Sequence, residues 1–202
     1  SADLCLRVRD RGLRTLWTPA AMLVHYGGVS IKARQRQPAN ALATAIALAA
    51  GLRAHELLTL APRQERAPDP RPAADSKFAG REGVIYTVQG KGGLVREVLI
   101  PSPLAERLEH VRLASPVRVT DRGVFYQSQY AIGGGQRWSN AFSAASMRTL
   151  GWSRGAHGVR HSYAQQRMQE LQKLGLVRDM ALRTVSQEMG HFRPEITETY
   201  LR

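Results

Sequence analysis

A glycine-rich turn between two apolar segments places one β-hairpin in the middle of an otherwise helical sequence. Residues 84–88 read Val-Ile-Tyr-Thr-Val, residues 94–100 read Leu-Val-Arg-Glu-Val-Leu-Ile, and Gly90-Lys91-Gly92-Gly93 lies between them. β-Branched and aromatic residues favour extended strands, and glycines supply the backbone conformations that a tight turn needs. Because strands joined in this way pair antiparallel, the sequence predicts an antiparallel sheet.

Helical patterns flank this hairpin on both sides. Small residues from Ala41 to Ala50 predict a helix, which Gly51 interrupts before the pattern resumes from Arg53 to Leu60. Further helices are predicted at residues 104–113, 139–150, 157–174, 179–189 and 194–201. Gly175 and Gly190 are typical of helix ends. The predicted fold class is therefore α+β, mainly helical, with a small antiparallel β-sheet.

The chain falls into unequal parts. Residues 1–30 have the pattern of a short amphipathic helix and a strand-like segment, and residues 31–38 form a basic, polar linker. Residues 39–202 carry most of the predicted elements and are long enough to enclose one well-buried core. The proline-rich segment 62–72 predicts an exposed loop, because proline disrupts regular structure.

The positive charge of the chain limits the choice of partner. The sequence has 29 lysine and arginine residues against 16 aspartate and glutamate residues, so its formal net charge is +13. Of the basic residues 25 are arginines, whose planar side chains bind phosphate oxygens in pairs. Such a surface attracts polyanions, and nucleic acid is the leading candidate. A genome rich in arginine codons is the alternative explanation.

Several other classes of protein fit the sequence poorly. The single cysteine, Cys5, excludes an intramolecular disulfide. No apolar run approaches the roughly 18 residues of a membrane span, and no segment joins a cationic stripe to a long apolar face. The N-terminus lacks the pattern of a signal peptide. We therefore expect a cytoplasmic protein without a membrane partner.

Reactive side chains are concentrated in four short motifs. The motifs are Gly51-Leu52-Arg53-Ala54-His55-Glu56-Leu57, Gly90-Lys91-Gly92-Gly93, His157-Gly158-Val159-Arg160, and Gly190-His191 with Tyr200 nine residues later. From the composition alone, a histidine followed three residues later by an arginine, as in His157 and Arg160, is expected by chance. A Gly-His pair followed nine residues later by a tyrosine is rarely expected by chance. The four motifs together supply a nucleophile, guanidinium groups, an ammonium group and imidazoles, which suit chemistry on a phosphodiester.

Tyr200 is the candidate nucleophile. A free tyrosine hydroxyl has a pKa of about 10, so attack at neutral pH requires a nearby base or a cationic environment. His157 and the guanidinium groups can provide both. Arg53 and Arg160 can hold the two non-bridging oxygens of a phosphate and stabilise the additional negative charge of the transition state.

Lys91 and His191 complete the predicted catalytic set. Lys91 lies on a turn that can fold over the reaction centre and protonate the departing 5′-oxygen, with Arg96 as the nearest basic alternative. His191 would donate a hydrogen bond to the phosphate. Because side chains supply the positive charge, and the sequence has no convincing carboxylate cluster for magnesium, we expect no metal and no other cofactor.

Residues 38–202 resemble the catalytic domain of the tyrosine recombinase (phage integrase) family. The four motifs fall on the family's motifs. The resemblance implies that the scissile phosphate is surrounded by Arg53, Lys91, His157, Arg160 and His191, and that Tyr200 is the nucleophile. It implies a site-specific recombinase or integrase that cleaves and rejoins double-stranded DNA through a 3′-phosphotyrosine intermediate. It also implies a tetramer on DNA, association with the nucleoid and no small-molecule substrate.

Alternatives to this function stay open. One is a DNA-binding remnant of an integrase that holds DNA without cutting it, and another is a type IB topoisomerase, which shares the chemistry but relaxes supercoils without synapsis. At single residues, Arg53 with Glu56 is also typical of a helix ion pair, and Lys91 of a solvated turn. Tyr200 also fits an aromatic residue of the core.

Residues 1–30 have a resemblance of their own. Segments 3–12, 18–21 and 24–28 look like a fragment near the C-terminal end of a family 2 glycosyltransferase catalytic domain. A carbohydrate-active protein is therefore a further alternative, but such an enzyme needs a nucleotide-sugar fold and an acidic metal motif before this point. The segment differs in character from the DNA-clamping domain of recombinases, so a recombinase impaired in DNA affinity and synapsis is a further alternative.

Overall fold

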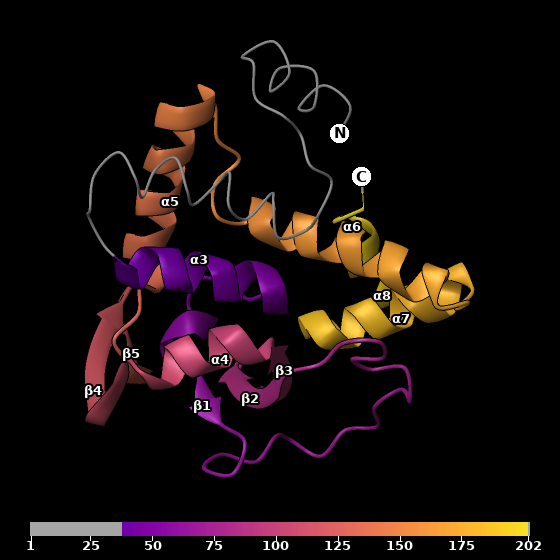
Figure 1. Cartoon of the computed structure of the whole chain (residues 1–202), viewed down its shortest axis with the longest axis horizontal. Coiled ribbons are helices and arrows are strands. Elements are labelled where there is room, and N and C mark those ends of the chain that lie inside the picture. The colour runs from indigo at the N-terminus through magenta and orange to yellow at the C-terminus, as the bar shows by residue number, and fades with distance from the viewer. Residues whose placement is uncertain (1–37, 202) are drawn as a thin grey trace.

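The computed structural model describes residues 38–201, and they form a mixed α+β fold that is mainly helical (Figure 1). Helices α6 (Gly158–Lys173), α7 (Arg178–Met189) and α8 (Pro194–Glu198) gather on one side, and the strands lie on the other (Figure 1). The predicted fold class is confirmed. The predictions made for residues 1–37 lie outside the described residues.

The predicted hairpin forms two strands of a three-stranded sheet. β2 (Val84–Gln89) pairs antiparallel with β3 (Val95–Ile100), and β1 (Ala61–Pro62) pairs antiparallel with the other edge of β2. The register sets Val84 opposite Ile100, so the glycine-rich turn closes the hairpin as expected. Alternate residues of the two strands enter the core, namely Tyr86, Val88, Val98 and Ile100.

Helix α3 (Pro38–Ala50) lies in the first hydrophobic core and contacts β3, α4 (Ser102–Glu109), α5 (Gly135–Leu150) and α6. Its buried side chains are small or branched, so neighbouring elements approach closely. The helical pattern predicted from Arg53 to Leu60 forms only a single 3-10 turn, η1 (Glu56–Thr59). This short turn is buried throughout, and it carries Glu56 into the interior.

A second sheet is absent from the sequence predictions. Helix α4 (Ser102–Glu109) ends four residues before the predicted Leu113, and the chain enters β4 (Arg112–Asp121), which pairs antiparallel with β5 (Val124–Tyr130). The prediction of helix as far as Leu113 was therefore wrong. Most of β4 is exposed, and an irregularity near Pro116 interrupts its register, so the sequence lacks the alternating pattern of a strand.

The helices after the second sheet lie near their predicted positions. α5 (Gly135–Leu150) begins four residues early, α6 and α7 agree to within one residue, and α8 ends at Glu198. Gly190 ends α7 in the left-handed conformation, as predicted. Within residues 38–201, none of the helices combines the length and apolar character that spanning a membrane requires.

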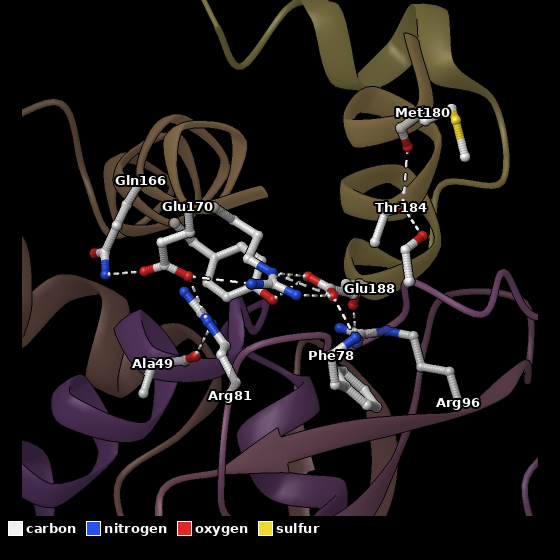
Figure 2. Close-up of polar contacts among 12 residues, drawn as sticks. Ala49, Phe78, Arg81, Arg96, Gln166, Glu170, Met180, Thr184 and Glu188 are labelled. Atoms are coloured by element: carbon white, nitrogen blue, oxygen red, sulfur yellow. Dashed lines mark hydrogen bonds and ion pairs between the residues drawn. The ribbon is translucent and has the colours of Figure 1, made fainter. Parts of the chain in front are cut away.

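The long loop between β1 and β2 packs against α7 along its second half. The loop predicted at residues 62–72 is mostly exposed from residue 63 onward, but Pro62 is buried as the last residue of β1, so the prediction was wrong for that residue. Further along, the Ser76 hydroxyl lies 2.5 Å from that of Thr184, and the Phe78 amide donates to Glu188 Oε1 at 2.8 Å. Figure 2 shows Phe78 and Glu188 in contact at the end of α7. The loop therefore ties α7 to the segment that leads into β2.

Candidate active site

Three of the six predicted site residues lie around the ring of a fourth, Tyr200. They are His157, Arg160 and His191. The Tyr200 ring centroid lies 5.1 Å from that of His157 and 5.0 Å from that of His191. The guanidinium carbon of Arg160 lies 5.4 Å from the same centroid. The folded chain thus brings together residues from before α6, within α6, between α7 and α8, and after α8.

Arg53 joins this cluster through a buried carboxylate. Glu56 is fully buried, and its oxygens accept hydrogen bonds from Arg53 Nη1 and Arg96 Nη2, each at 2.8 Å. A third guanidinium, that of Arg160, lies 3.9 Å away. Burial alone would raise the pKa of Glu56, but Arg96, Arg160 and Arg53 outweigh it and lower the pKa to about 2. Glu56 is therefore the shared counter-ion of three arginines.

Arg160 fixes the orientation of His191. Its Nη1 donates to the carbonyl of Gly51, and its Nη2 donates to the carbonyl of Met189 at 3.1 Å. The same Nη2 lies 2.7 Å from His191 Nε2. Because a guanidinium can only donate, Nε2 must accept, and the proton of the neutral ring lies on Nδ1. Nδ1 then donates to Thr197 Oγ1 at 2.9 Å.

The two predicted catalytic histidines are neutral at neutral pH. The pKa of His191 is lowered to about 3, first by burial and then by the charges of Arg160, Arg53 and Arg96. The pKa of His157 is also lowered, by desolvation of its ring and by the charge of Arg160. A neutral imidazole retains a lone pair, so His157 has the protonation state of a base.

Acidification is expected to destabilise the fold through His191. The pKa is about 3 in the folded protein, and about 6.5 in an unfolded chain. The unfolded state therefore binds the proton first, and stability is lost as the pH falls from about 6.5 toward 3. Between pH 7 and pH 5 this group should lower the free energy of unfolding by up to about 2 kcal/mol.

Urea denaturation at several pH values measures this effect. In His191→Gln, the free energy of unfolding should depend less on pH between pH 7 and pH 5, by the amount that His191 contributes in the wild type. Glu56 does not interfere, because its stabilising effect is lost only below the ordinary glutamate pKa of about 4.3. Equal pH dependence in the two proteins would contradict the account.

Tyr200 lies at the edge of the second hydrophobic core and is 7% exposed. Its ring also contacts His161, with centroids 4.7 Å apart. Three imidazoles and a guanidinium therefore surround this ring, which is unusual for a residue that only fills a core. Among residues 38–201 its hydroxyl has no hydrogen-bond partner.

Lys91 is the one predicted site residue that lies outside the cluster. It is exposed in the hairpin turn, and within the described part of the chain it has no hydrogen bond or ion pair. The turn itself lies close by, because a β-carbon added to Gly90 would be 3.6 Å from Glu56 Oε1. In the protein without DNA, Lys91 is therefore a solvated residue of a turn, which was the alternative interpretation of its sequence. The backbone of the turn nevertheless adjoins the cluster.

Sequence reasoning underestimated two residues of the site. Arg96, considered as an alternative acid, is buried against Glu56 and the end of α7 and is not directed to solvent. His161, which follows Arg160 directly, is half-buried, and its ring packs against that of Tyr200 in a tilted arrangement. The spacing of His157 and His161, one helical turn apart, was the available signal for a shared face.

The cluster has a buried floor and an accessible rim. Arg96, Arg160 and Glu56 are buried, whereas the Arg53 side chain is 25% exposed and His157 is exposed. Three guanidinium groups face one carboxylate, so the cluster carries excess positive charge that favours an anion. In the part of the chain that the structure describes, no group of three or more His, Cys, Asp or Glu side chains is arranged to hold a metal ion.

Known proteins resemble this chain in structure but not in sequence. No protein-family model matches it, and no curated protein matches it in sequence. The structure is similar to the XerH site-specific recombinase in its post-cleavage complex with palindromic difH substrate, with a TM-score of 0.53 and 20% identity over 89% of this chain and 47% of that chain. The pre-cleavage complex of XerH with difH gives a TM-score of 0.53 and 21% identity over 89% and 48%.

These likenesses concern the fold, which resembles that of a tyrosine recombinase catalytic domain. The chain spans about half the length of the two XerH chains.

Proposed function

We propose that this chain is a tyrosine-type DNA strand transferase, a site-specific recombinase or integrase that forms a 3′-phosphotyrosine intermediate. The observation that carries the proposal is the packing of Tyr200 against His157, His191 and Arg160. A phenol beside neutral imidazoles and excess positive charge has the surroundings that nucleophilic attack on a phosphodiester requires. The recombinase-like fold agrees with this chemistry.

In the proposed reaction the Tyr200 oxygen attacks the phosphorus and the 5′-oxygen leaves. His157 accepts the phenol proton, Arg53 and Arg160 bind the non-bridging oxygens, and Lys91 gives a proton to the 5′-oxygen. The phosphodiester bond is exchanged for a phosphotyrosine bond, so a 5′-hydroxyl can reverse the step and rejoin the strand.

Substrate binding must rearrange the site from the state described here. Arg160 Nη2 now donates to His191, so Nε2 can face the phosphate only after that contact breaks and the ring proton moves from Nδ1 to Nε2, which leaves Nδ1 to accept from Thr197 Oγ1. Arg53 needs less change, because of its guanidinium nitrogens only Nη1 binds Glu56 and the side chain is partly exposed. We propose that the phosphate displaces His191 from Arg160 and then receives hydrogen bonds from both.

Duplex DNA is the proposed partner, bound by a tetramer at the nucleoid in the cytoplasm. The net charge of +13 supports a polyanionic partner. Both XerH structures are complexes with difH substrate. Binding should weaken steeply with salt, because each phosphate contact releases counter-ions.

A nicked duplex tests the proposal. A nick near the cleavage site lets the short 5′-product diffuse away, so the covalent adduct accumulates. A protease-sensitive, DNA-linked band on a denaturing gel is the expected result. The assay should use a set of nicked duplexes of random sequence. If the protein binds these duplexes but forms the band with none of them, the result would instead support a DNA-binding remnant. Relaxation of supercoiled plasmid without strand exchange would support a type IB topoisomerase.

Lys91→Ala is expected to slow strand cleavage by about 10²–10⁴-fold, because the 5′-oxygen loses its acid. The exposed position of Lys91 means that the free energy of unfolding should change by no more than about 0.5 kcal/mol. A substrate with sulfur in place of the bridging 5′-oxygen should restore the rate, since a thiolate leaves without protonation.

Lys173→Ala provides the matched control, because Lys173 is also exposed but lies at the end of α6. It should cleave both substrates at the wild-type rate. An Lys91→Ala variant equally slow on the sulfur substrate would exclude the proposed acid role.

A further inference from the structure

One guanidinium joins the floor of the proposed active site to the end of α7. Arg96, on β3, donates from Nη2 to Glu56 Oε2 at 2.8 Å and from Nη1 to the carbonyl of Glu188 at 2.6 Å. Only 4% of Arg96 is exposed. Glu56 in turn holds Arg53, so a single buried side chain connects the carboxylate beneath the arginines to the segment that precedes His191.

The last carbonyls of α7 are satisfied by residues of this cluster. Arg96 binds the carbonyl of Glu188, Arg160 binds that of Met189, and the His191 amide binds that of Ser186 at 2.9 Å. Carbonyls in the last turn of a helix have no partner within the helix, and the helix dipole makes this end attractive to cations. Two arginines, both facing Glu56, therefore clamp the end of α7.

Glu188 is held from its side chain as well as from its carbonyl. Its carboxylate accepts two hydrogen bonds from Arg167 at 3.0 Å, one from the Tyr163 hydroxyl at 2.8 Å and one from the Phe78 amide at 2.8 Å. Figure 2 shows Glu188 between this network and Arg96. With both ends of Glu188 fixed, the α7 end cannot shift without breaking buried hydrogen bonds.

The turn from α7 to His191 is also shaped around Arg96. Gly190 has a φ of 72°, and a β-carbon added there would lie 2.6 Å from Arg96 Cδ. Any other residue at this position would press on the Arg96 side chain. The position of His191 thus depends on Arg96 through a hydrogen bond on one side and close packing on the other.

We infer that Arg96 is a positioning residue, which sets His191 and Arg160 beside Tyr200 by locking the end of α7 to Glu56. It acts through its neighbours and touches neither DNA nor the reacting atoms. The inference deepens the proposed function, and its catalytic consequence rests on that function. Its structural consequence, the placement of the His191 ring, does not.

The test compares the wild type with Arg96→Gln, Arg96→Lys and the control Arg63→Gln. Arg63 binds Glu97, the neighbour of Arg96 on β3, but its side chain is 58% exposed. The first readout is the NMR titration of His191 in the free protein. In Arg96→Gln the pKa of His191 should rise and its Nδ1–H tautomer should no longer dominate. Arg96→Lys should lie between Arg96→Gln and the wild type, and Arg63→Gln should match the wild type.

The second readout separates DNA affinity from the rate of adduct formation. In Arg96→Gln, the rate at saturating nicked duplex should fall by about 10²-fold, because the catalytic groups are misplaced. The Kd for DNA should stay within about twofold, because Arg96 donates to Glu56 and to the Glu188 carbonyl and is not among the groups proposed to bind the phosphate. If the wild type forms no adduct, the proposed function fails while the titration still decides the positioning role.

Two glycine substitutions provide a second test in case Arg96→Gln does not fold. Gly151 ends α5 with a φ of 76°, and a β-carbon there would meet nothing within 4 Å. Gly190→Ala should therefore alter the His191 titration, and Gly151→Ala, with the same backbone cost, should not. Folded Arg96→Gln and Gly190→Ala proteins with an unchanged His191 titration would overturn the inference.

Discussion

Replacing Tyr200 by phenylalanine is expected to abolish the covalent adduct with DNA while leaving the fold intact. The change removes only the hydroxyl oxygen, which is the atom that forms the phosphotyrosine bond in the proposed reaction. Loss of a nucleophile that acts with its neighbours as a unit costs at least about 10⁴-fold in rate. Because that hydroxyl has no hydrogen-bond partner among residues 38–201, the free energy of unfolding should change by less than about 0.5 kcal/mol.

Tyr126→Phe is the matched control for this prediction. Tyr126 lies on β5 and stacks on His55, with centroids 6.2 Å apart, so it is a second tyrosine near the Arg53 motif. Its variant should form adduct at the wild-type rate. Adduct in the Tyr200→Phe protein, or its loss in Tyr126→Phe, would assign the nucleophile to another residue.

Glu56→Gln is expected to cause the largest loss of stability. The substitution leaves Arg96 and Arg160 buried without their shared counter-charge. Removing one member of a buried ion pair costs about 3–5 kcal/mol, and urea denaturation at pH 7 measures it. The pKa of about 2 also fixes the pH dependence, since the contribution of Glu56 is present above the ordinary glutamate pKa and is lost as the pH falls toward 2.

Glu97→Gln separates burial from charge in this prediction. Glu97 also binds two cations, Arg63 at 2.6 Å and Lys77 at 3.0 Å, but its side chain is 22% exposed and Arg63 is open to solvent. Exposed pairs contribute about 0–1 kcal/mol, so this variant should be nearly as stable as the wild type. If Glu56→Gln lowered the free energy of unfolding by no more than Glu97→Gln does, Glu56 would be an ordinary ion-pair residue.

Local patterns in the sequence were sufficient to predict much of the fold. The hairpin around Lys91, the end of α7 at Gly190 and the starts of α6 and α7 depend on nearby residues, and they were found. The β4 and β5 pair was missed because its register is irregular and most of β4 is exposed, so alternation of apolar residues is lost.

The candidate site was partly visible in the sequence because the proposed chemistry requires particular residue types. Arg53, Arg160, His157, His191 and Tyr200 could be named from their motifs, and the structure gathers them. The sharing of Glu56 by three arginines could not be predicted, since it depends on Arg96, which lies 40 residues away along the chain. Nor could the loop that holds Glu188, because its contacts cross about 110 residues.

The most direct measurement of the central claim is peptide mapping of the adduct by mass spectrometry. After incubation with nicked duplex, digestion by nuclease and protease should leave a peptide that carries a nucleotide phosphate on the Tyr200 oxygen. The account predicts this modification on Tyr200, with the DNA attached through its 3′ end. A nucleotide attached to any other residue, or attached through its 5′ end, would contradict it.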